Sequence, residues 1–280
     1  MPYKTVLTYL DPSDRAGARL SFSLELAKTL DAHLIGLFTT FVPEARDYFS
    51  VAGCAHYYDD WLDARRGQRD AAEEAFRHAL RSAGLGGEWI AFDDYAEAPM
   101  IRRSRHADLL IAGQTGPDDD SQALRKRFLE GVVLTSGRPV LVLPYAGGLR
   151  PAGNSIAIAW DGSREAARAV RDAMPFLERA GRVTVLRVRS TDSLRRVTTG
   201  AQGGEIDLML ARHAVNVDFA EATSDSDETA ADALLSWVAT SGCDLVVAGA
   251  YSHPQWQEQW LGGVTRALLE SATVPVLLSH

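Results

Sequence analysis

Cysteine is scarce in this chain: only Cys54 and Cys243 occur among 280 residues, far apart in the sequence. Two isolated cysteines support neither a disulfide framework nor a cysteine-based zinc site, and we expect a reducing compartment. The histidines and carboxylates show no metal-ligand spacing either. Disulfide-stabilised and metal-dependent proteins are therefore not expected.

Long apolar runs and positive charge are also lacking. No segment reaches the roughly 18 consecutive apolar residues of a membrane span, and the opening MPYKTVLTYLDPSD meets acidic residues early. The net charge is -8, and the short basic run at 125–127 follows three aspartates at 118–120. An acidic surface repels phosphate backbones, so we expect a soluble cytoplasmic protein with neither a nucleic-acid nor a membrane partner.

The sequence contains a long internal repeat. KTVLTYLDPSDR from Lys4 and NSIAIAWDGSRE from Asn154 each read as an apolar strand, an Asp, a Ser-containing turn and an amphipathic helix. ADLLIAGQTG from Ala107 and CDLVVAGAYS from Cys243 each lead to a closing apolar strand 31 positions after their Asp. The offset between copies is about 150 at the front and 136 at the back, which indicates duplicated domains.

Apolar strands alternate with helices in both copies, which is typical of a parallel sheet covered on both faces. The Gly- and Pro-rich stretch 145–155 reads as a linker, so we predict domains at 1–148 and 152–280. The class expected is α/β, with two tandem doubly wound domains, each a five-stranded parallel sheet flanked by helices. Ligands of such sheets bind beyond the carboxyl ends of the strands. The predicted strands are roughly 5–10, 33–39, 88–92, 109–113, 140–143, 155–160, 183–189, 215–219, 245–249 and 274–278.

Three repeated features resemble the universal stress protein family in its tandem two-domain form, over essentially the whole chain. They are the Asp-x-Ser openings, the strands ending in Gly and the closing strands that begin at Pro, found at Asp11 and Asp161, Gly113 and Gly249, and Pro139 and Pro275. The resemblance implies an adenine nucleotide alpha hydrolase-like fold and a role in stress response. It also implies that final strands pair about a two-fold axis, so we expect an internal pseudo-dimer that can dimerise further.

Nucleotide-binding members of that family share a loop G-x2-G-x9-G-[S/T], and the Asp after the first strand helps to hold the adenosine. In the second copy Gly249 and Gly262 keep this spacing, whereas Ser252 replaces the second Gly and Gly263 the hydroxyl residue. Thr265 offers another hydroxyl at the helix start. Glycines let the backbone approach an anion, and a helix N-terminus supplies N–H donors. With Asp161, these residues predict a weakened site for ATP or AMP.

Structural alternatives apply to several of these residues. An Asp between a strand and a helix is commonly a turn former or cap, which would explain both Asp11 and Asp161 without a ligand. Trp256 and Trp260 are four apart, and either stack on an adenine or pack on the protein. The insertion 41–60 is either a lid or partner surface, or an excursion packed over its own domain.

The first copy departs further from the loop pattern. Gly113 and Gly116 keep its first half, but Lys126 and Arg127 stand where the Gly and the hydroxyl residue belong. Two long cations would either fill the phosphate space or neutralise an acidic ligand, while the aspartates at 118–120 would repel one. We expect a solvated loop that binds no nucleotide.

Three functions fit this pattern. The first is a non-catalytic stress protein whose second copy binds nucleotide and acts through pairing or partner binding. The second is an interaction scaffold that uses no nucleotide, and the third is a slow ATPase. No Ser-His-Asp relay accompanies Ser13 or Ser163, so we name no catalytic residue.

Overall fold

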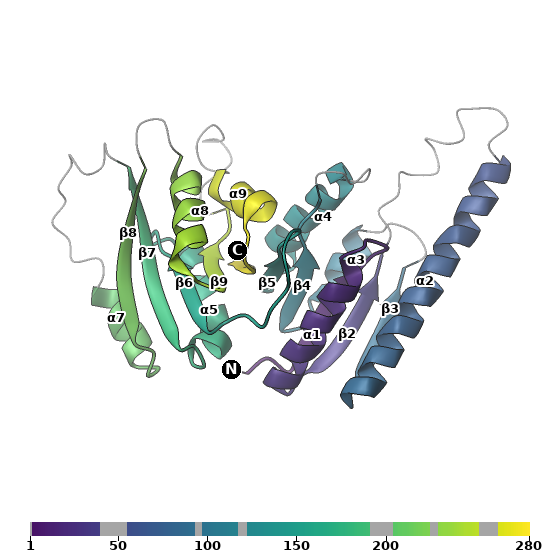
Figure 1. The fold of residues 1–280 in the computed structure, drawn as a ribbon, viewed down its shortest axis with the longest axis horizontal. Helices are drawn as coiled ribbons and strands as arrows, with labels where there is room; N and C mark the ends of the chain where they lie inside the picture. Colours follow the sequence, from purple (N-terminus) through teal and green to yellow (C-terminus); the bar gives the residue numbers. More distant parts are fainter. Residues whose placement is uncertain are drawn as a thin grey trace. The chain divides into compact units, whose positions relative to one another are not determined.

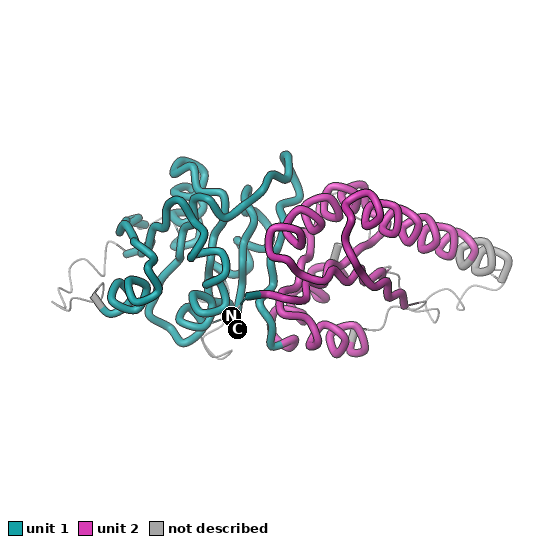
Figure 2. Tube along the Cα trace, turned by 90° about the horizontal axis from the view of Figure 1, so that it is seen from below, with its two compact units in different colours: residues 1–2, 137–280 teal, residues 3–136 magenta. Residues whose placement is uncertain are grey.

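The computed structural model describes residues 2–39, 55–92, 97–116, 122–190, 204–224, 229–251 and 263–280. The chain divides into two compact units, shown in Figure 2. The amino-terminal unit is Tyr3–Ser136, in magenta, and the carboxy-terminal unit is Gly137–His280 with Met1–Pro2, in teal. Each unit is described by itself below.

The amino-terminal unit is a parallel sheet in the order β3-β2-β1-β4. Its helices α1 and α2 pack together, as do α3 and α4, with one pair on each face of the sheet (Figure 1). This arrangement is doubly wound. The elements are β1 (Thr5–Leu10), α1 (Ala16–Leu30), β2 (His33–Phe38), α2 (Ala55–Ala83), β3 (Gly87–Ala91), α3 (Glu97–Ser104), β4 (Leu109–Gly113) and α4 (Gln122–Thr135).

The carboxy-terminal unit has the strand order β5-β10-β9-β6-β7-β8. Helices α8 and α9 lie side by side on one face of this sheet, and α5 packs on the other (Figure 1). The elements are β5 (Val140–Leu143), β6 (Ser155–Ala159), α5 (Arg164–Leu177), β7 (Arg182–Ser190), α7 (Gly204–Ala211), β8 (Val217–Ser224), α8 (Ala230–Ser241), β9 (Leu245–Gly249), α9 (Gly263–Ser271) and β10 (Val276–Ser279).

The aspartates that precede β4 and β9 tie the sheet together at its amino end. The carboxylate of Asp108 accepts hydrogen bonds from the backbone N–H groups of Lys4 at 2.8 Å and Thr5 at 2.9 Å. Asp244 does the same for Gly153 at 2.8 Å and Ser155 at 3.1 Å. These repeated aspartates therefore have a structural role, at the end of the sheet opposite to the expected ligand edge.

The doubly wound α/β fold predicted from the sequence is confirmed, and most strand limits agree within two residues. The exception is β8, predicted at 215–219 and found at Val217–Ser224, whose end is displaced because it stays paired with β7 as far as Ser224. Its start is displaced as well. Ala214 adopts a left-handed φ of 59°, and the N–H of Val215 bonds to the carbonyl of Leu210. Val215 is therefore part of the cap that ends α7, so the strand begins later.

Strand β5 closes the first repeat but lies in the carboxy-terminal unit. It pairs antiparallel with β10, so that Val142 faces Val276 and Val140 faces Leu278. The expected pairing of the two closing strands is thus present. Among the described residues, the amino-terminal unit contains four strands and the carboxy-terminal unit six, where the sequence predicted five in each. The boundary at 148–152 concerns the duplicated segments and stays a prediction.

Helix α2 contains the end of the insertion 41–60, because it begins at Ala55. Its carboxy-terminal half packs on the sheet through Phe76 and Leu80, both buried. The Phe76 ring lies 5.4 Å from that of Trp89 and covers Gly36, where a β carbon would stand only 2.8 Å from Phe76. Residues 41–54 lie outside the described part of the chain, so both interpretations of the insertion stay open.

Candidate functional site

Each repeat has one edge where the expected site residues meet. The first strand of each repeat lies beside the fourth, with Thr8 opposite Ile111 and Ala159 opposite Ala248. The residues that follow β1 and β4, and those that follow β6 and β9, therefore lie at a shared carboxyl edge. The strand order reverses at this point, and ligands of doubly wound sheets bind at such a switch point.

In the carboxy-terminal unit, Asp161 forms the turn between β6 and α5. Its Oδ1 accepts the N–H of Ser163 at 2.9 Å. Ser163 in turn caps α5, because its Oγ accepts the N–H of Ala166 at 3.1 Å. Asp161 therefore forms a turn, as the structural alternative to ligand binding predicted. Its carboxylate is exposed and lies beside the N-terminus of α5.

Gly249 is fixed by a close approach to the first turn of α5. A β carbon at this position would stand 2.4 Å from the backbone N of Ala166 and 2.6 Å from the backbone C of Glu165. Any side chain would collide with the helix backbone, so packing alone requires glycine here. The contact brings the end of β9, the N-terminus of α5 and the Asp161 turn together.

Thr265 and Tyr251 join the two ends of the candidate phosphate loop. Thr265 lies in the first turn of α9 and is buried, and its Oγ1 accepts the N–H of Tyr251 at 3.1 Å. Tyr251 has a left-handed φ of 53°. A threonine hydroxyl that accepts one hydrogen bond still has its own proton to donate. Thr265 therefore closes the base of the loop, and its hydroxyl has a proton that a ligand could accept.

Of the remaining candidate residues, the structure describes Gly263 only. Gly263 begins α9, and no described atom lies within 4 Å of the position that its β carbon would take. Ser252 and Gly262 lie outside the described residues, as do Trp256 and Trp260. The structure thus places Asp161 and Gly249 at one edge and Thr265 at the base of the loop.

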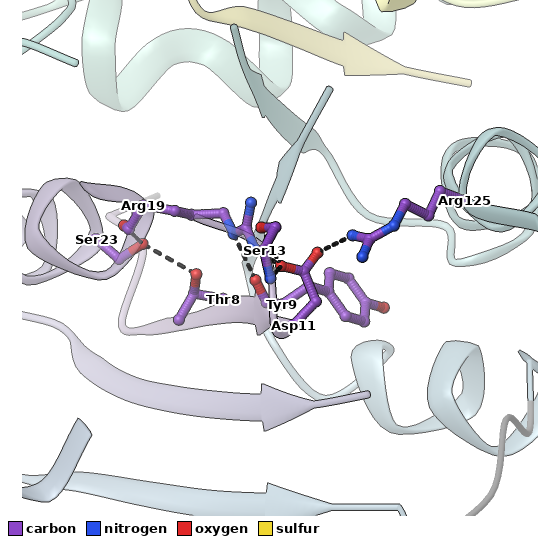
Figure 3. A network of polar contacts seen from close by, with 7 residues as sticks. All are labelled: Thr8, Tyr9, Asp11, Ser13, Arg19, Ser23 and Arg125. Atoms are coloured by element: carbon purple, nitrogen blue, oxygen red, sulfur yellow. Dashed lines mark hydrogen bonds and ion pairs between the residues drawn. The ribbon is translucent and has the colours of Figure 1, made fainter. Parts of the chain in front are cut away.

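In the amino-terminal unit, the carboxyl edge of the sheet contains an ion-pair cluster around Asp11 (Figure 3). Oδ1 of Asp11 accepts Arg19 Nη2 at 2.8 Å and the N–H of Ser13 at 3.1 Å, and Oδ2 pairs with Nη1 of Arg125. The exposed fractions of the side chains are 11% for Asp11, 4% for Arg19 and 15% for Arg125. The cluster is therefore mostly removed from water, where charge-assisted hydrogen bonds are strong.

The charges of the cluster keep Asp11 ionised. Burial by itself would raise the pKa of Asp11, but the charges of Arg19 and Arg125 and the hydrogen bonds from Ser13 lower that pKa to about 2. Arg19 is also fixed from the other side, because its Nε donates to the carbonyl of Tyr9 at 2.7 Å. Both carboxylate oxygens of Asp11 are thus engaged by the protein itself.

Arg19 also fills the space above the end of β4. A β carbon at Gly113 would stand 2.3 Å from Nη1 of Arg19. The sequence directed attention to Lys126 and Arg127 as the cations of this loop, yet the cation that reaches the edge is Arg125, one position earlier. Two arginine side chains therefore occupy the carboxyl edge of the amino-terminal unit.

Sequence reasoning missed Arg19 and Arg125, although the repeat carried a signal for both. At the offset of 150, Arg19 aligns with Ala169, and at the offset of 136, Arg125 aligns with Leu261. Both positions change from a cation in the first copy to an apolar residue in the second. Such a change at a shared ligand edge would have pointed to a difference between the two sites.

A metal cluster and a membrane-spanning helix are both absent from the described ranges. Within them, no group of three or more histidine, cysteine or carboxylate residues is arranged to hold a metal ion. None of the helices in those ranges combines the length and the apolar character needed to cross a membrane.

Comparison with known proteins agrees with this fold. The model of the Universal stress protein family matches residues 154–280. A universal stress protein from Archaeoglobus fulgidus is 17% identical, with a TM-score of 0.71 and a match over 98% of this chain and 95% of that chain. A functionally unknown protein from Pseudomonas aeruginosa is 16% identical, with a TM-score of 0.63 over 99% of this chain and 92% of that chain. No curated protein matches the sequence. Residues 154–280 thus match the universal stress protein family, and nearly the whole length of the chain shares its tandem fold with these solved structures.

Proposed function

We propose that the chain is a non-catalytic, cytoplasmic stress-response protein whose second repeat binds an adenine nucleotide, ATP or AMP, at the carboxyl edge of β6 and β9. Occupancy of that edge would alter pairing or partner choice. One observation carries the proposal: Asp161 and Gly249 meet at the switch point beside a helix N-terminus. At this edge Ala169 stands where the first repeat has Arg19.

Each described residue has a role in this proposal. The carboxylate of Asp161 accepts a hydrogen bond from the adenine amine or a ribose hydroxyl. The backbone around Gly263 approaches the phosphate at the start of α9, where unpaired N–H groups and the helix dipole favour an anion. The hydroxyl of Thr265 donates its remaining proton towards the loop. Ser252 and Gly262 are proposed from their loop spacing alone.

A nucleotide-independent interaction scaffold is the second candidate. It is favoured by the fact that three of the candidate residues already have structural roles. Asp161 forms a turn, Gly249 packs against α5, and Thr265 bonds to Tyr251. A loop that no longer binds nucleotide would keep all three of these contacts.

Calorimetric titration of the full chain with ATP, ADP and AMP separates the two candidates. We expect heat of binding in the wild type, and its loss in Gly262→Val because a side chain blocks the approach of the backbone to phosphate. Lys126→Ala is the matched control, because Lys126 follows Gly113 at the distance at which Gly262 follows Gly249. An absence of heat at millimolar nucleotide would establish the scaffold instead.

A slow ATPase is the third candidate, and it requires its own assay. Phosphate release by the wild type is compared with release by Asp161→Ala prepared identically. We expect equal, background rates, since the sequence pattern indicates no catalytic residue for this loop. Release above that of the variant would make the protein an enzyme.

A further inference from the structure

Helix α4 contacts the end of β1 through two side chains on one face. Arg125 and Phe128 are three positions apart, so they point in the same direction from the helix. Arg125 pairs with Asp11, and the Phe128 ring packs edge-on against Tyr9 with 5.0 Å between the ring centres. The partners, Tyr9 and Asp11, are themselves only two positions apart. One ionic and one aromatic contact therefore fix the start of α4 to β1.

Buried polar contacts support this junction from behind. The hydroxyl of Tyr9 bonds to Oγ of Ser104, which donates to the carbonyl of Met100 at 2.8 Å and so links β1 to α3. Oγ of Ser23 lies 3.0 Å from Oγ1 of Thr8 and 2.8 Å from the carbonyl of Arg19 (Figure 3). The backbone of Arg19 is thus tied to β1 through Ser23 and Thr8, and its guanidinium bonds to the carbonyl of Tyr9.

The second repeat cannot form the same junction. At the two repeat offsets Asp11 is kept as Asp161, but five other side chains of the junction and its support are replaced by apolar residues without the required polar group or ring. The replacements are Ile158 for Thr8, Ala159 for Tyr9, Ala173 for Ser23, Leu261 for Arg125 and Val264 for Phe128. Among the described contacts, the start of α9 is joined to its loop by the bond between Thr265 and Tyr251 instead.

We propose that Asp11, Arg19 and Arg125, with Tyr9 and Phe128, form a latch that fixes α4 to β1 without any ligand. Arg19 stands in the space above Gly113, so the carboxyl edge of the amino-terminal unit is closed by its own side chains. A tandem chain with this latch has one edge closed by its own side chains, whatever binds at the other edge. The latch goes beyond the proposed function, because it holds whether or not the second repeat binds nucleotide.

Hydrogen exchange of the α4 amides in the full chain tests the latch. Arg125→Ala removes the ionic contact, and we expect α4 to exchange at least about tenfold faster, since local opening governs exchange. Arg102→Ala is the control, because Arg102 is an exposed arginine of the same unit, on α3. Combining Asp11→Asn with Arg125→Ala should cost less α4 protection than the sum of the two single losses, because both substitutions remove the same contact. Equal α4 exchange in Arg125→Ala and Arg102→Ala, or fully additive losses, would overturn the latch.

Two further measurements keep the proposal testable if Arg125→Ala folds poorly. Arg125→Lys keeps the charge, and we expect it to retain most of the α4 protection, whereas Arg125→Gln should lose it. Addition of ATP to the wild type should leave α4 exchange unchanged. Protection of α4 by ATP, or equal exchange in the Lys and Gln variants, would contradict a closed, ion-paired edge. All of these variants lie in the first repeat. If the second repeat fails to bind nucleotide, the proposed function fails but the result for the latch is unaffected.

Discussion

Nη1 of Arg19 lies 2.3 Å from the point where a β carbon at Gly113 would stand. The arginine therefore uses the space that a glycine leaves at the end of β4. In the second repeat the corresponding glycine, Gly249, is approached by helix backbone instead. The same residue type at the same strand end thus serves two different packing arrangements.

Gly113→Ala should destabilise the amino-terminal unit. The added methyl group displaces the end of the Arg19 side chain and weakens its pairing with Asp11, and we expect a loss of about 0.5 to 3 kcal/mol, the usual range for a point substitution. Gly17→Ala in α1 is the matched control, because no described atom lies near its β-carbon position and alanine favours a helix by about 0.5 to 1 kcal/mol. Urea unfolding followed by circular dichroism measures both. Equal stability of the two variants would contradict the packing described for Arg19.

Acid should remove the stability that Asp11 contributes. Because the pKa of Asp11 is lowered in the folded state from 3.8 to about 2, its contribution is fully present above the unfolded value and disappears as the pH falls through about 2. The shift corresponds to about 2 kcal/mol. We expect the stability difference between wild type and Asp11→Asn to shrink from about pH 5 to about pH 2. A difference that stays constant over this range would show that the charge of Asp11 is not responsible.

Thr265→Val should weaken the base of the candidate loop. Valine keeps the shape of threonine but leaves the N–H of Tyr251 without its acceptor, at a cost of about 1 to 3 kcal/mol. Thr265→Ser keeps the hydroxyl and should lose less. Thermal unfolding compares the variants, and exchange of the Tyr251 amide localises the effect. If both variants unfold alike, the hydrogen bond has no measurable role.

The repeat made most of the fold predictable. Central strands such as β4 and β9 are continuous apolar runs bounded by Asp and Gly, so their limits could be read directly from the sequence. Placing β5 in the carboxy-terminal unit depends on its antiparallel pairing with β10, which no local pattern shows. The start of β8 was displaced because Val215 packs into a helix cap rather than into the strand.

The site was predictable only where local spacing defined it. Asp161 and Gly249 follow from the repeat, because the ends of adjacent parallel strands share an edge. The pairing of Asp11 with Arg125 joins residues 114 positions apart, and its neighbours Lys126 and Arg127 gave the same basic signal. Arg19 reads as an ordinary helix residue until its side chain is seen above Gly113.

The number of nucleotides bound per chain tests the central claim most directly. Calorimetric titration of the full chain with ATP or AMP should give one site, lost in Gly262→Val and kept in Arg125→Ala, because Arg19 and Arg125 occupy the edge of the first repeat. Two sites per chain, or one site that survives Gly262→Val, would contradict the assignment of the site to the second repeat. No binding of either nucleotide would contradict the proposed function itself.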